Sequence, residues 1–271
     1  MGNFEKVTYA TIARMSEFYR GKRSKNLFDP AVNGPGKEPF RLSRSKIEVF
    51  LRCARCFYLD RRLGVGEPPG YPFNLNSAVD HLLKKEFDRH RAGKTPHPLM
   101  AAYGLKAVPF QHAELDKWRE NFVGIQYLHS ATNLLITGAL DDVWQNEAGE
   151  LIVVDYKATS KDSEVNLDAD WQRGYKNQVE IYQWLLHQNG FKVSPTAYFV
   201  YANGKKDREA FDARLEFDVT LLPYEGNYSW VEGVLGKIND CLMSEALPPA
   251  SSECDYCTYR QAAGQALARF K

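Results

Sequence analysis

The chain has 271 residues, of which 44% are hydrophobic and 25% charged, and its formal net charge is +1. These proportions are typical of a folded globular protein and exclude a disordered chain. The longest apolar runs are far shorter than the ~20 residues that a membrane span needs, and the first residues lack the apolar core of a signal peptide, so we expect a cytoplasmic protein with no membrane partner.

The N-terminal part of the chain is predicted to contain three helices separated by breaker-rich segments. Residues 8–22 have the pattern of a helix with a basic end, whereas residues 23–42 carry Gly, Pro and Asn breakers and predict a loop or extended arm. A short helix follows over 45–53. After a Gly- and Pro-rich passage at 64–73, residues 76–93 have helical periodicity and end on a glycine.

The rest of the chain alternates between helical and strand patterns. Two apolar segments with strand character flank a turn of sequence NEAGE, which predicts a β-hairpin. This order of elements predicts an α/β fold with a central mixed β-sheet flanked by helices. We expect an N-terminal helix and basic arm over 1–42 and a single domain over 43–271. The predicted elements are a helix over 113–124, the hairpin over 126–157, a helix over 170–189, strands over 195–203 and 213–222, and a helix over 227–245 followed by a short C-terminal helix.

The two arms of the predicted hairpin carry Asp141, Asp142, Asp155 and Lys157. If the turn centres on Ala148, Asp141 lies opposite Asp155, and side chains opposite each other on antiparallel strands are roughly 5 Å apart. Lys157 lies two residues beyond Asp155 and therefore points to the same face. The pattern predicts two carboxylates and a lysine on one face of otherwise apolar strands.

Charged residues in such strands are costly unless they are paired or bind a metal ion. Two facing carboxylates repel each other, and a hard cation such as Mg²⁺ relieves that repulsion. A lysine beside them supplies positive charge where a phosphate is attacked, or orients a water molecule. The alternative is a plain ion pair between Asp141 and Lys157 at the open edge of a hairpin.

The sequence G-A-L-D at 138–141, followed by D-Y-K at 155–157, resembles the core of the PD-(D/E)XK nuclease superfamily. The resemblance is closest to the RecB-like branch, which includes the iron–sulfur-cluster nucleases of CRISPR adaptation. That branch has a Q-x-x-x-Y motif on the next helix, which corresponds here to Gln178 and Tyr182, on one helix face. The resemblance implies a restriction-endonuclease-like core. It also implies a Mg²⁺- or Mn²⁺-dependent nuclease whose catalytic residues are Asp141, Asp155, Lys157, Gln178 and Tyr182, with Asp141 and Asp155 as metal ligands.

The same branch has a helical G-x-x-x-H segment whose histidine binds the metal ion. The corresponding segment here is N-S-A-V-D-H at 76–81. When the two are aligned on the small residue and the valine, Asp80 takes the place of the histidine, and His81 follows one residue later. We expect Asp80 to be the third ligand, with His81 as the alternative, because one residue along a helix turns a side chain by ~100°.

Four of the five cysteines form two C-x-x-C pairs, Cys53 with Cys56 and Cys254 with Cys257. Without a secretion signal, such pairs predict metal ligands rather than disulfides. Four thiolates suit a [4Fe–4S] cluster or Zn²⁺. The segment over 45–59 also resembles the cluster-binding segment of the branch named above, which favours the cluster and leaves Zn²⁺ as the alternative. Either metal would join the N-terminal and C-terminal segments, and Cys241 is expected in the core.

The charge of the chain is distributed unevenly. Residues 1–95 contain 19 Lys and Arg against 10 Asp and Glu, whereas residues 96–271 contain 16 against 24. A basic surface of this kind suits the phosphate backbone of DNA, and neighbouring aromatic residues favour single-stranded DNA. The predicted function is therefore a divalent-metal-dependent deoxyribonuclease of repair, recombination or defence. The candidates for backbone contacts are Arg41, Arg44, Lys46, Arg52, Arg55, Arg61 and Arg62.

Two other functions are compatible with the same residues. A protein that binds nucleic acid without cleaving it would retain the nuclease fold and the four-cysteine site, and the aspartate at position 80 is the main argument for it. A zinc-containing structural protein, in which the D-Y-K sequence is accidental, is the third possibility. Retention of Asp141, Asp155 and Lys157 together favours the nuclease.

Overall fold

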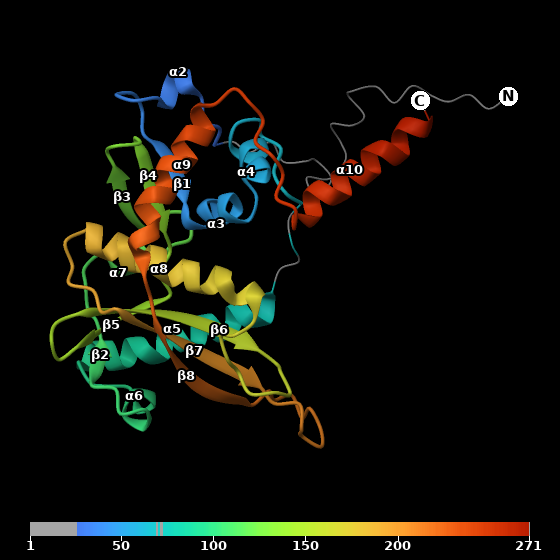
Figure 1. Cartoon of the computed structure of the whole chain (residues 1–271). Helices are drawn as coiled ribbons and strands as arrows, with labels where there is room; N and C mark the ends of the chain where they lie inside the picture. Colours follow the sequence, from blue (N-terminus) through green and yellow to red (C-terminus); the bar gives the residue numbers. More distant parts are fainter. Residues whose placement is uncertain (1–25, 69, 71–72, 271) are drawn as a thin grey trace, which may run out of the picture. The chain divides into compact units, whose positions relative to one another are not determined.

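The computed structural model describes residues 26–68, 70 and 73–270, and the helix predicted over 8–22 lies outside them (Figure 1). The chain falls into two compact units. The first, which we call the cysteine unit, is drawn from Met1–Glu38, Val49–Gly70 and Ile238–Lys271. The second, which we call the sheet unit, is drawn from Pro39–Glu48 and Tyr71–Lys237.

The sheet unit contains a five-stranded mixed sheet in the order β2-β5-β6-β7-β8. Strands β6 and β7 are parallel, and the other neighbouring pairs are antiparallel. The central strand β6 is buried along its first six residues, as expected for a strand with both faces covered. This confirms the predicted mixed sheet. The strands are β2 (Ala107–Pro109), β5 (Asp142–Asn146), β6 (Leu151–Thr159), β7 (Thr196–Gly204) and β8 (Phe217–Glu225).

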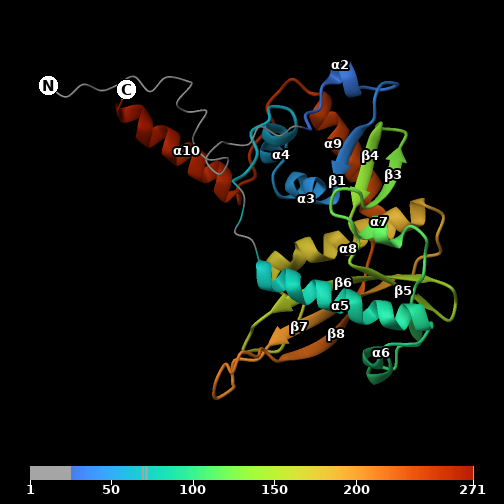
Figure 2. The same cartoon turned by 180° about the vertical axis from the view of Figure 1, so that it is seen from behind.

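Two long helices of the sheet unit pack on β6. Helix α5 (Asn74–Gly93) lies across the five-stranded sheet (Figure 2), and its Phe87 packs with Trp144 and Tyr156. Helix α8 (Arg173–Gln188) contacts β6 and also the strands of a second, smaller sheet. Contact with both sheets explains why α8 is buried continuously from Asn177 to Leu186.

The smaller sheet has three strands in the order β1-β4-β3. Its existence corrects the prediction of one continuous strand before the NEAGE turn. The chain leaves β4 after Gly138 and begins β5 in the larger sheet at Asp142, so only β5 and β6 form the predicted hairpin. A single-sequence pattern cannot separate two strands that follow each other directly in different sheets. The strands are β1 (Phe40–Ser43), β3 (Ile125–His129) and β4 (Leu134–Gly138).

The predicted N-terminal loop and helix are more structured than expected. The segment predicted as a loop over 23–42 contains helix α2, which begins with a proline and is capped by the side chain of Asp29, and strand β1. The helix predicted over 45–53 is followed by a second helix that begins after Cys53. These helices are α2 (Pro30–Asn33), α3 (Arg44–Arg52) and α4 (Ala54–Arg61).

The remaining helices follow the predicted order with different bounds. The helix predicted over 113–124 is shorter because Glu120 adopts an extended conformation and Gly124 a positive φ. No helix among the described residues is long and apolar enough to cross a membrane. The helices are α6 (Pro98–Ala102), α7 (Leu115–Arg119), α9 (Val231–Met243) and α10 (Asp255–Leu267), with 3₁₀ turns at Asp170–Gln172, Tyr228–Trp230 and Ala268–Phe270.

Candidate active site

The candidate site lies where strand β6 extends beyond strand β5. The pairing of β5 with β6 begins at Asp142 opposite Val154, in the register that the turn predicts. Residues 155–159 of β6 still pair with β7, but β5 has ended on their other side. There the carboxylate of Asp141 accepts a hydrogen bond from the backbone N–H of Tyr156 at 3.0 Å. Beyond the end of β5, the Asp141 side chain therefore accepts the backbone hydrogen bond that a neighbouring strand would otherwise accept.

Asp155 and Lys157 lie on β6 beside this position. Asp155 is fully buried, and its Oδ1 accepts a hydrogen bond of 2.7 Å from Nε2 of Gln178 on α8. Its Oδ2 forms an ion pair with Lys157. Nε2 of Gln178 lies 3.3 Å from the hydroxyl of Tyr182, one helical turn further on. The structure thus brings Asp141, Asp155, Lys157 and the Gln–Tyr pair of α8 together.

Burial is the largest single influence on the pKa values of Asp155 and Lys157. It raises the pKa of Asp155 to about 7, against the attraction of Lys157 and with the repulsion of Asp141. Burial alone would lower the pKa of Lys157, but the charges of Asp155 and Asp141 raise it. Ionised Asp155 is therefore expensive in the metal-free protein, and a divalent cation beside it would lower that cost.

A cavity of about 300 Å³ is lined by Asp141 and Lys157 of this group. Helix α5 is held at the cavity by a hydrogen bond of 3.0 Å from Asn76 to the carbonyl of Ala158. Asp80 of α5 lines the cavity, whereas His81 is exposed and outside the lining. The structure therefore places Asp80, the expected ligand, near Asp141. The lining residues include Asp80, Asp141, Lys157 and Tyr175, whose ring centroid lies 4.5 Å from Nζ of Lys157.

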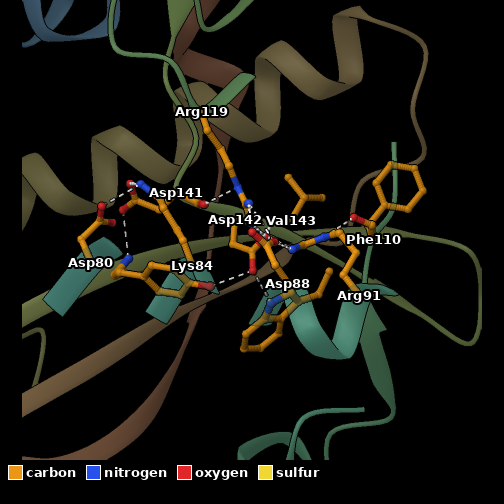
Figure 3. A network of polar contacts seen from close by, with 11 residues as sticks. Asp80, Lys84, Asp88, Arg91, Phe110, Arg119, Asp141, Asp142 and Val143 are labelled. Carbon is orange, nitrogen blue, oxygen red and sulfur yellow. Dashed lines mark hydrogen bonds and ion pairs between the residues drawn. The ribbon is translucent and has the colours of Figure 1, made fainter. Parts of the chain in front are cut away.

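Lys84, which the sequence did not single out, joins two of the carboxylates. Its Nζ lies 2.9 Å from Oδ2 of Asp80 and 3.4 Å from Oδ1 of Asp141 (Figure 3). Although burial alone would lower the pKa of Lys84, Asp141 and Asp80 raise it. The available signal was the spacing of four residues between Asp80 and Lys84 on one helix.

The site fits a divalent cation held by Asp141 and Asp155. Both residues present carboxylate oxygens, the ligands that Mg²⁺ and Mn²⁺ prefer. Oδ2 of Asp155 is buried and, apart from its ion pair with Lys157, accepts no hydrogen bond from the described residues. An ionised oxygen in that situation is a good metal ligand because a cation compensates for the missing hydrogen bonds.

Arg44 is a second residue whose position the sequence did not predict. It was expected on a DNA-binding surface, but its guanidinium interacts with Tyr182 and its charge acts on Asp155. Burial is the main reason why the pKa of Tyr182 is raised, and Arg44 opposes that rise. Arg44 comes from the start of α3, far from the D-Y-K motif in sequence, so only folding brings it to the site.

Gly138 is needed for the close packing of β4 against α8. A Cβ atom at this position would lie 2.6 Å from Cε1 of Tyr182 and 3.0 Å from Cδ1 of Leu185. Because both neighbours are buried, we expect Gly138→Ala to reduce the free energy of unfolding by about 1–3 kcal/mol. Urea denaturation measures the change. Gly233→Ala is the control, since nothing lies within 4 Å of that position and alanine favours its helix.

Asp142, the first residue of β5, lies outside the cavity lining and forms a buried network. Its carboxylate is fully buried and accepts hydrogen bonds from Arg91, Arg119 and Tyr156 (Figure 3). Nε1 of Trp144 donates a fourth bond at 3.2 Å, and the backbone N–H of Val143 a fifth at 2.8 Å. The adjacent aspartates therefore have different environments: Asp141 lines the open cavity, whereas Asp142 is fully buried.

The four cysteines of the two C-x-x-C pairs meet in the cysteine unit. Their sulfur atoms all lie within 4.8 Å of one another, and no other group of potential ligands among the described residues is as close. Cys56 lies 3.4 Å from Cys254 and 3.6 Å from Cys257, and Cys53 lies 3.8 Å from Cys257. This confirms that the cysteines form a possible metal site joining N-terminal and C-terminal segments.

Hydrogen-bond donors surround these sulfur atoms. The backbone N–H of Ser251 points to Cys53 at 3.5 Å, and Arg260 donates to Cys56 at 3.2 Å. Burial opposes ionisation of Cys53, but the bonds from Ser251 and Cys56 lower the pKa of its thiol to about 7. At least one thiolate is therefore accessible at neutral pH, as metal binding requires. Cys241 lies outside the cluster, as expected, but it is only half-buried, whereas the sequence predicts a core position.

The basic residues expected on a DNA-binding surface are mostly held in internal contacts. Arg61 is 6% exposed and pairs with Asp60, so it is not an exposed cation. Phe57 and Tyr58 are buried as well and do not offer faces for base stacking. Of the remaining candidates, Lys46 is half-buried, Arg41 donates to the carbonyl of Val123, Arg52 pairs with Glu67, Arg55 donates to the carbonyl of Pro248, and Arg62 donates to the carbonyl of Phe28.

Comparison with known proteins supplies the family. No curated protein matches the chain. The crystal structure of SSO0001 is similar with a TM-score of 0.38 and 15% sequence identity, over 83% of this chain and 85% of that one. A model of the PD-(D/E)XK nuclease superfamily matches residues 75–262, which include the D-Y-K motif, Gln178 and Tyr182. With more than half of its length matched, the chain belongs to the PD-(D/E)XK nuclease superfamily.

Proposed function

We propose that the protein is a divalent-metal-dependent nuclease that hydrolyses phosphodiester bonds of DNA. The observation that carries the proposal is the convergence of Asp141 and Lys157, which line one open cavity, with the buried Asp155, which pairs with Lys157. An accidental D-x-K sequence would not also be expected to have a glutamine hydrogen-bonded to its carboxylate from the next helix. We place this activity in the cytoplasm, in DNA repair, recombination or defence, as part of the same proposal.

The roles of the residues follow from their contacts. A divalent cation bound by Asp141 and Asp155 would polarise the phosphate and lower the pKa of a bound water molecule. Gln178 fixes the orientation of Asp155 through its 2.7 Å hydrogen bond. Lys157 lines the cavity, and its ammonium group would stabilise negative charge that develops on the phosphate. The hydroxyl of Tyr182 lies within hydrogen-bond distance of Gln178, and Arg44 interacts with Tyr182. Both residues would therefore help to position Gln178 against Asp155.

A second candidate is a protein that binds nucleic acid without cleaving it. One observation favours this candidate. Where the branch has a histidine ligand, this chain has Asp80, and the Asp80 carboxylate is engaged by Lys84 at 2.9 Å. Loss of a ligand at this position would weaken metal binding while leaving the fold intact.

A cleavage assay decides between the two candidates. The purified chain is incubated with labelled single-stranded and double-stranded DNA in Mg²⁺, in Mn²⁺ and in EDTA. The nuclease proposal expects cleavage with either metal ion, none in EDTA, and none by Lys157→Ala. Lys106→Ala is the control, because the Lys106 side chain is 77% exposed and lies outside the cavity lining. Binding of DNA without any cleavage by the unmodified chain would favour the second candidate.

For the cysteine site we propose a single Zn²⁺ ion in place of the [4Fe–4S] cluster that the resemblance implies. Tetrahedral Zn²⁺ with Zn–S bonds of about 2.3 Å spaces its sulfur ligands about 3.8 Å apart. A [4Fe–4S] cluster binds each thiolate to a different iron, which spaces the sulfur atoms farther apart. The sulfur separations of 3.4, 3.6 and 3.8 Å, with all four sulfur atoms within 4.8 Å of one another, support the zinc ion.

Metal analysis tests this assignment. We expect about one Zn²⁺ per chain and a colourless protein, since Zn²⁺ has no redox chemistry and four thiolates complete its shell. Cys254→Ser should lose the metal and lower the melting temperature, whereas Cys241→Ser, outside the cluster, should keep both. Iron and sulfide in a brown, anaerobically purified protein would instead establish the cluster.

A further inference from the structure

The position between Asp80 and Asp141 is occupied by a cation that the chain itself supplies. Nζ of Lys84 lies 2.9 Å from Oδ2 of Asp80 and 3.4 Å from Oδ1 of Asp141 (Figure 3). Lys84 lies on the same helix as Asp80, one turn further along, so the helix places both side chains on one face. Its side chain is 20% exposed, which limits the space in which it can move away.

Asp141 consequently has a distinct partner for each of its oxygens. Oδ2 accepts the backbone N–H of Tyr156 at 3.0 Å, and Oδ1 faces Lys84. At Asp155, Gln178 occupies Oδ1, and Oδ2 is paired with Lys157 and accepts no hydrogen bond from the described residues. Lys84 therefore bridges two carboxylates, those of Asp80 and Asp141, whereas the ion pair of Lys157 is with Asp155 alone among the described residues.

The balance of charge disfavours a second metal ion. Three carboxylates (Asp80, Asp141 and Asp155) face two ammonium groups (Lys84 and Lys157) and the guanidinium of Arg44, so the ionised group carries no net charge. One divalent ion gives the group two positive charges, and a second ion would have to enter a site that is already positive. Unlike a metal ion, Lys84 cannot be removed by a chelator.

Resting on the proposed function, we infer that Lys84 is a built-in cation that takes the place of a second metal ion between Asp80 and Asp141. The site then holds one divalent ion, between Asp141 and Asp155, and Asp80 serves to position Lys84 instead of binding that ion. This assigns Asp80 a role different from the metal ligand that the resemblance implies. It also makes Lys84 the residue that limits metal stoichiometry.

Metal binding without nucleic acid tests the inference directly. Mn²⁺ is titrated into the full chain, and free Mn²⁺ is followed by electron paramagnetic resonance. Lys84→Met removes the charge and keeps the length of the side chain. We expect it to raise Mn²⁺ affinity at least tenfold or to add a second equivalent. Lys85→Met, an exposed neighbour on the same helix, should match the unmodified chain.

A second substitution separates the role of Asp80 from a general change of charge. When Asp80→Asn is added to Lys84→Met, the increase in Mn²⁺ binding should disappear. The position that Lys84 vacates can bind Mn²⁺ only with the carboxylate of Asp80. The inference is overturned if Lys84→Met binds Mn²⁺ within threefold of the unmodified chain, or if the gain survives Asp80→Asn. Thermal melting of each variant verifies that it is folded.

The result for Lys84 and the result for nuclease activity are independent of each other. The inference is judged by the difference in Mn²⁺ binding between Lys84→Met and the unmodified chain. The nuclease proposal is judged by DNA cleavage in Mg²⁺ and Mn²⁺. A chain that cleaves DNA but shows no effect of Lys84→Met refutes the inference alone, whereas one that gains Mn²⁺ on Lys84→Met but never cleaves DNA refutes the nuclease alone.

Discussion

Asp155→Asn is expected to reduce DNA cleavage at least about a thousandfold, because it removes an ionised oxygen on which the whole site depends. The amide oxygen of asparagine can still accept the hydrogen bond from Gln178, so the substitution preserves the local packing. What it removes is the negative charge of Oδ2, which faces Lys157 and accepts no hydrogen bond from the described residues. The expected defect is therefore in metal binding and chemistry, and the fold should be retained.

The measurement is the initial rate of cleavage at saturating Mn²⁺, together with a Mn²⁺ titration and a thermal melt. Asp162→Asn is the matched control, since the Asp162 side chain is 86% exposed and pairs with Lys206 at the surface. Gln178→Ala, which removes a positioning hydrogen bond, should cost about 10–100-fold. Cleavage by a folded Asp155→Asn protein within tenfold of the unmodified rate would remove Asp155 from the mechanism.

The second large effect concerns stability and comes from Asp142. We expect Asp142→Asn to reduce the free energy of unfolding by about 3–5 kcal/mol, the usual cost of breaking a buried ion pair by removing one partner. The carboxylate is fully buried and compensates two guanidinium groups, those of Arg91 and Arg119. Both arginines are almost buried, with side chains 7% and 11% exposed, so neither reaches water readily when the carboxylate is lost.

Asp88→Asn provides a matched control for this prediction. Asp88 contacts the same two arginines, but its side chain is 45% exposed, so its ion pairs are screened by solvent. We expect it to cost no more than about 1 kcal/mol. Urea denaturation of both variants gives the comparison. Equal losses for Asp88→Asn and Asp142→Asn would show that burial of the carboxylate does not govern the energy of this network.

Much of the active site could be predicted from local sequence. The β5–β6 register follows from the position of the turn, and it predicts that Asp141 and Asp155 are close. The spacing of Gln178 and Tyr182 predicts one helix face, and both side chains meet beside Asp155. These predictions succeeded because each depends on a repeat that is set by the backbone alone, the period of a strand or of a helix.

The division of the strands could not be predicted in the same way. The segment from 132 to 145 has the composition of one strand, yet Asp141 lies in the break between β4 and β5. The break depends on which distant strand each half finds: β1 for β4, and β2 for β5. These two pairings join residues that are distant in sequence, and a local pattern carries no information about them.

Taken by itself, the sequence determined the residue types of the site, the hairpin register and the two C-x-x-C pairs, because these follow from composition and short-range periodicity. Only the tertiary structure decided what surrounds each charge. It placed Lys84 between Asp80 and Asp141, brought Arg44 to Tyr182, and buried Asp142 and Arg61 in ion pairs. The net charge of +1 shows none of these outcomes, since the role of a charge depends on its burial and its partners.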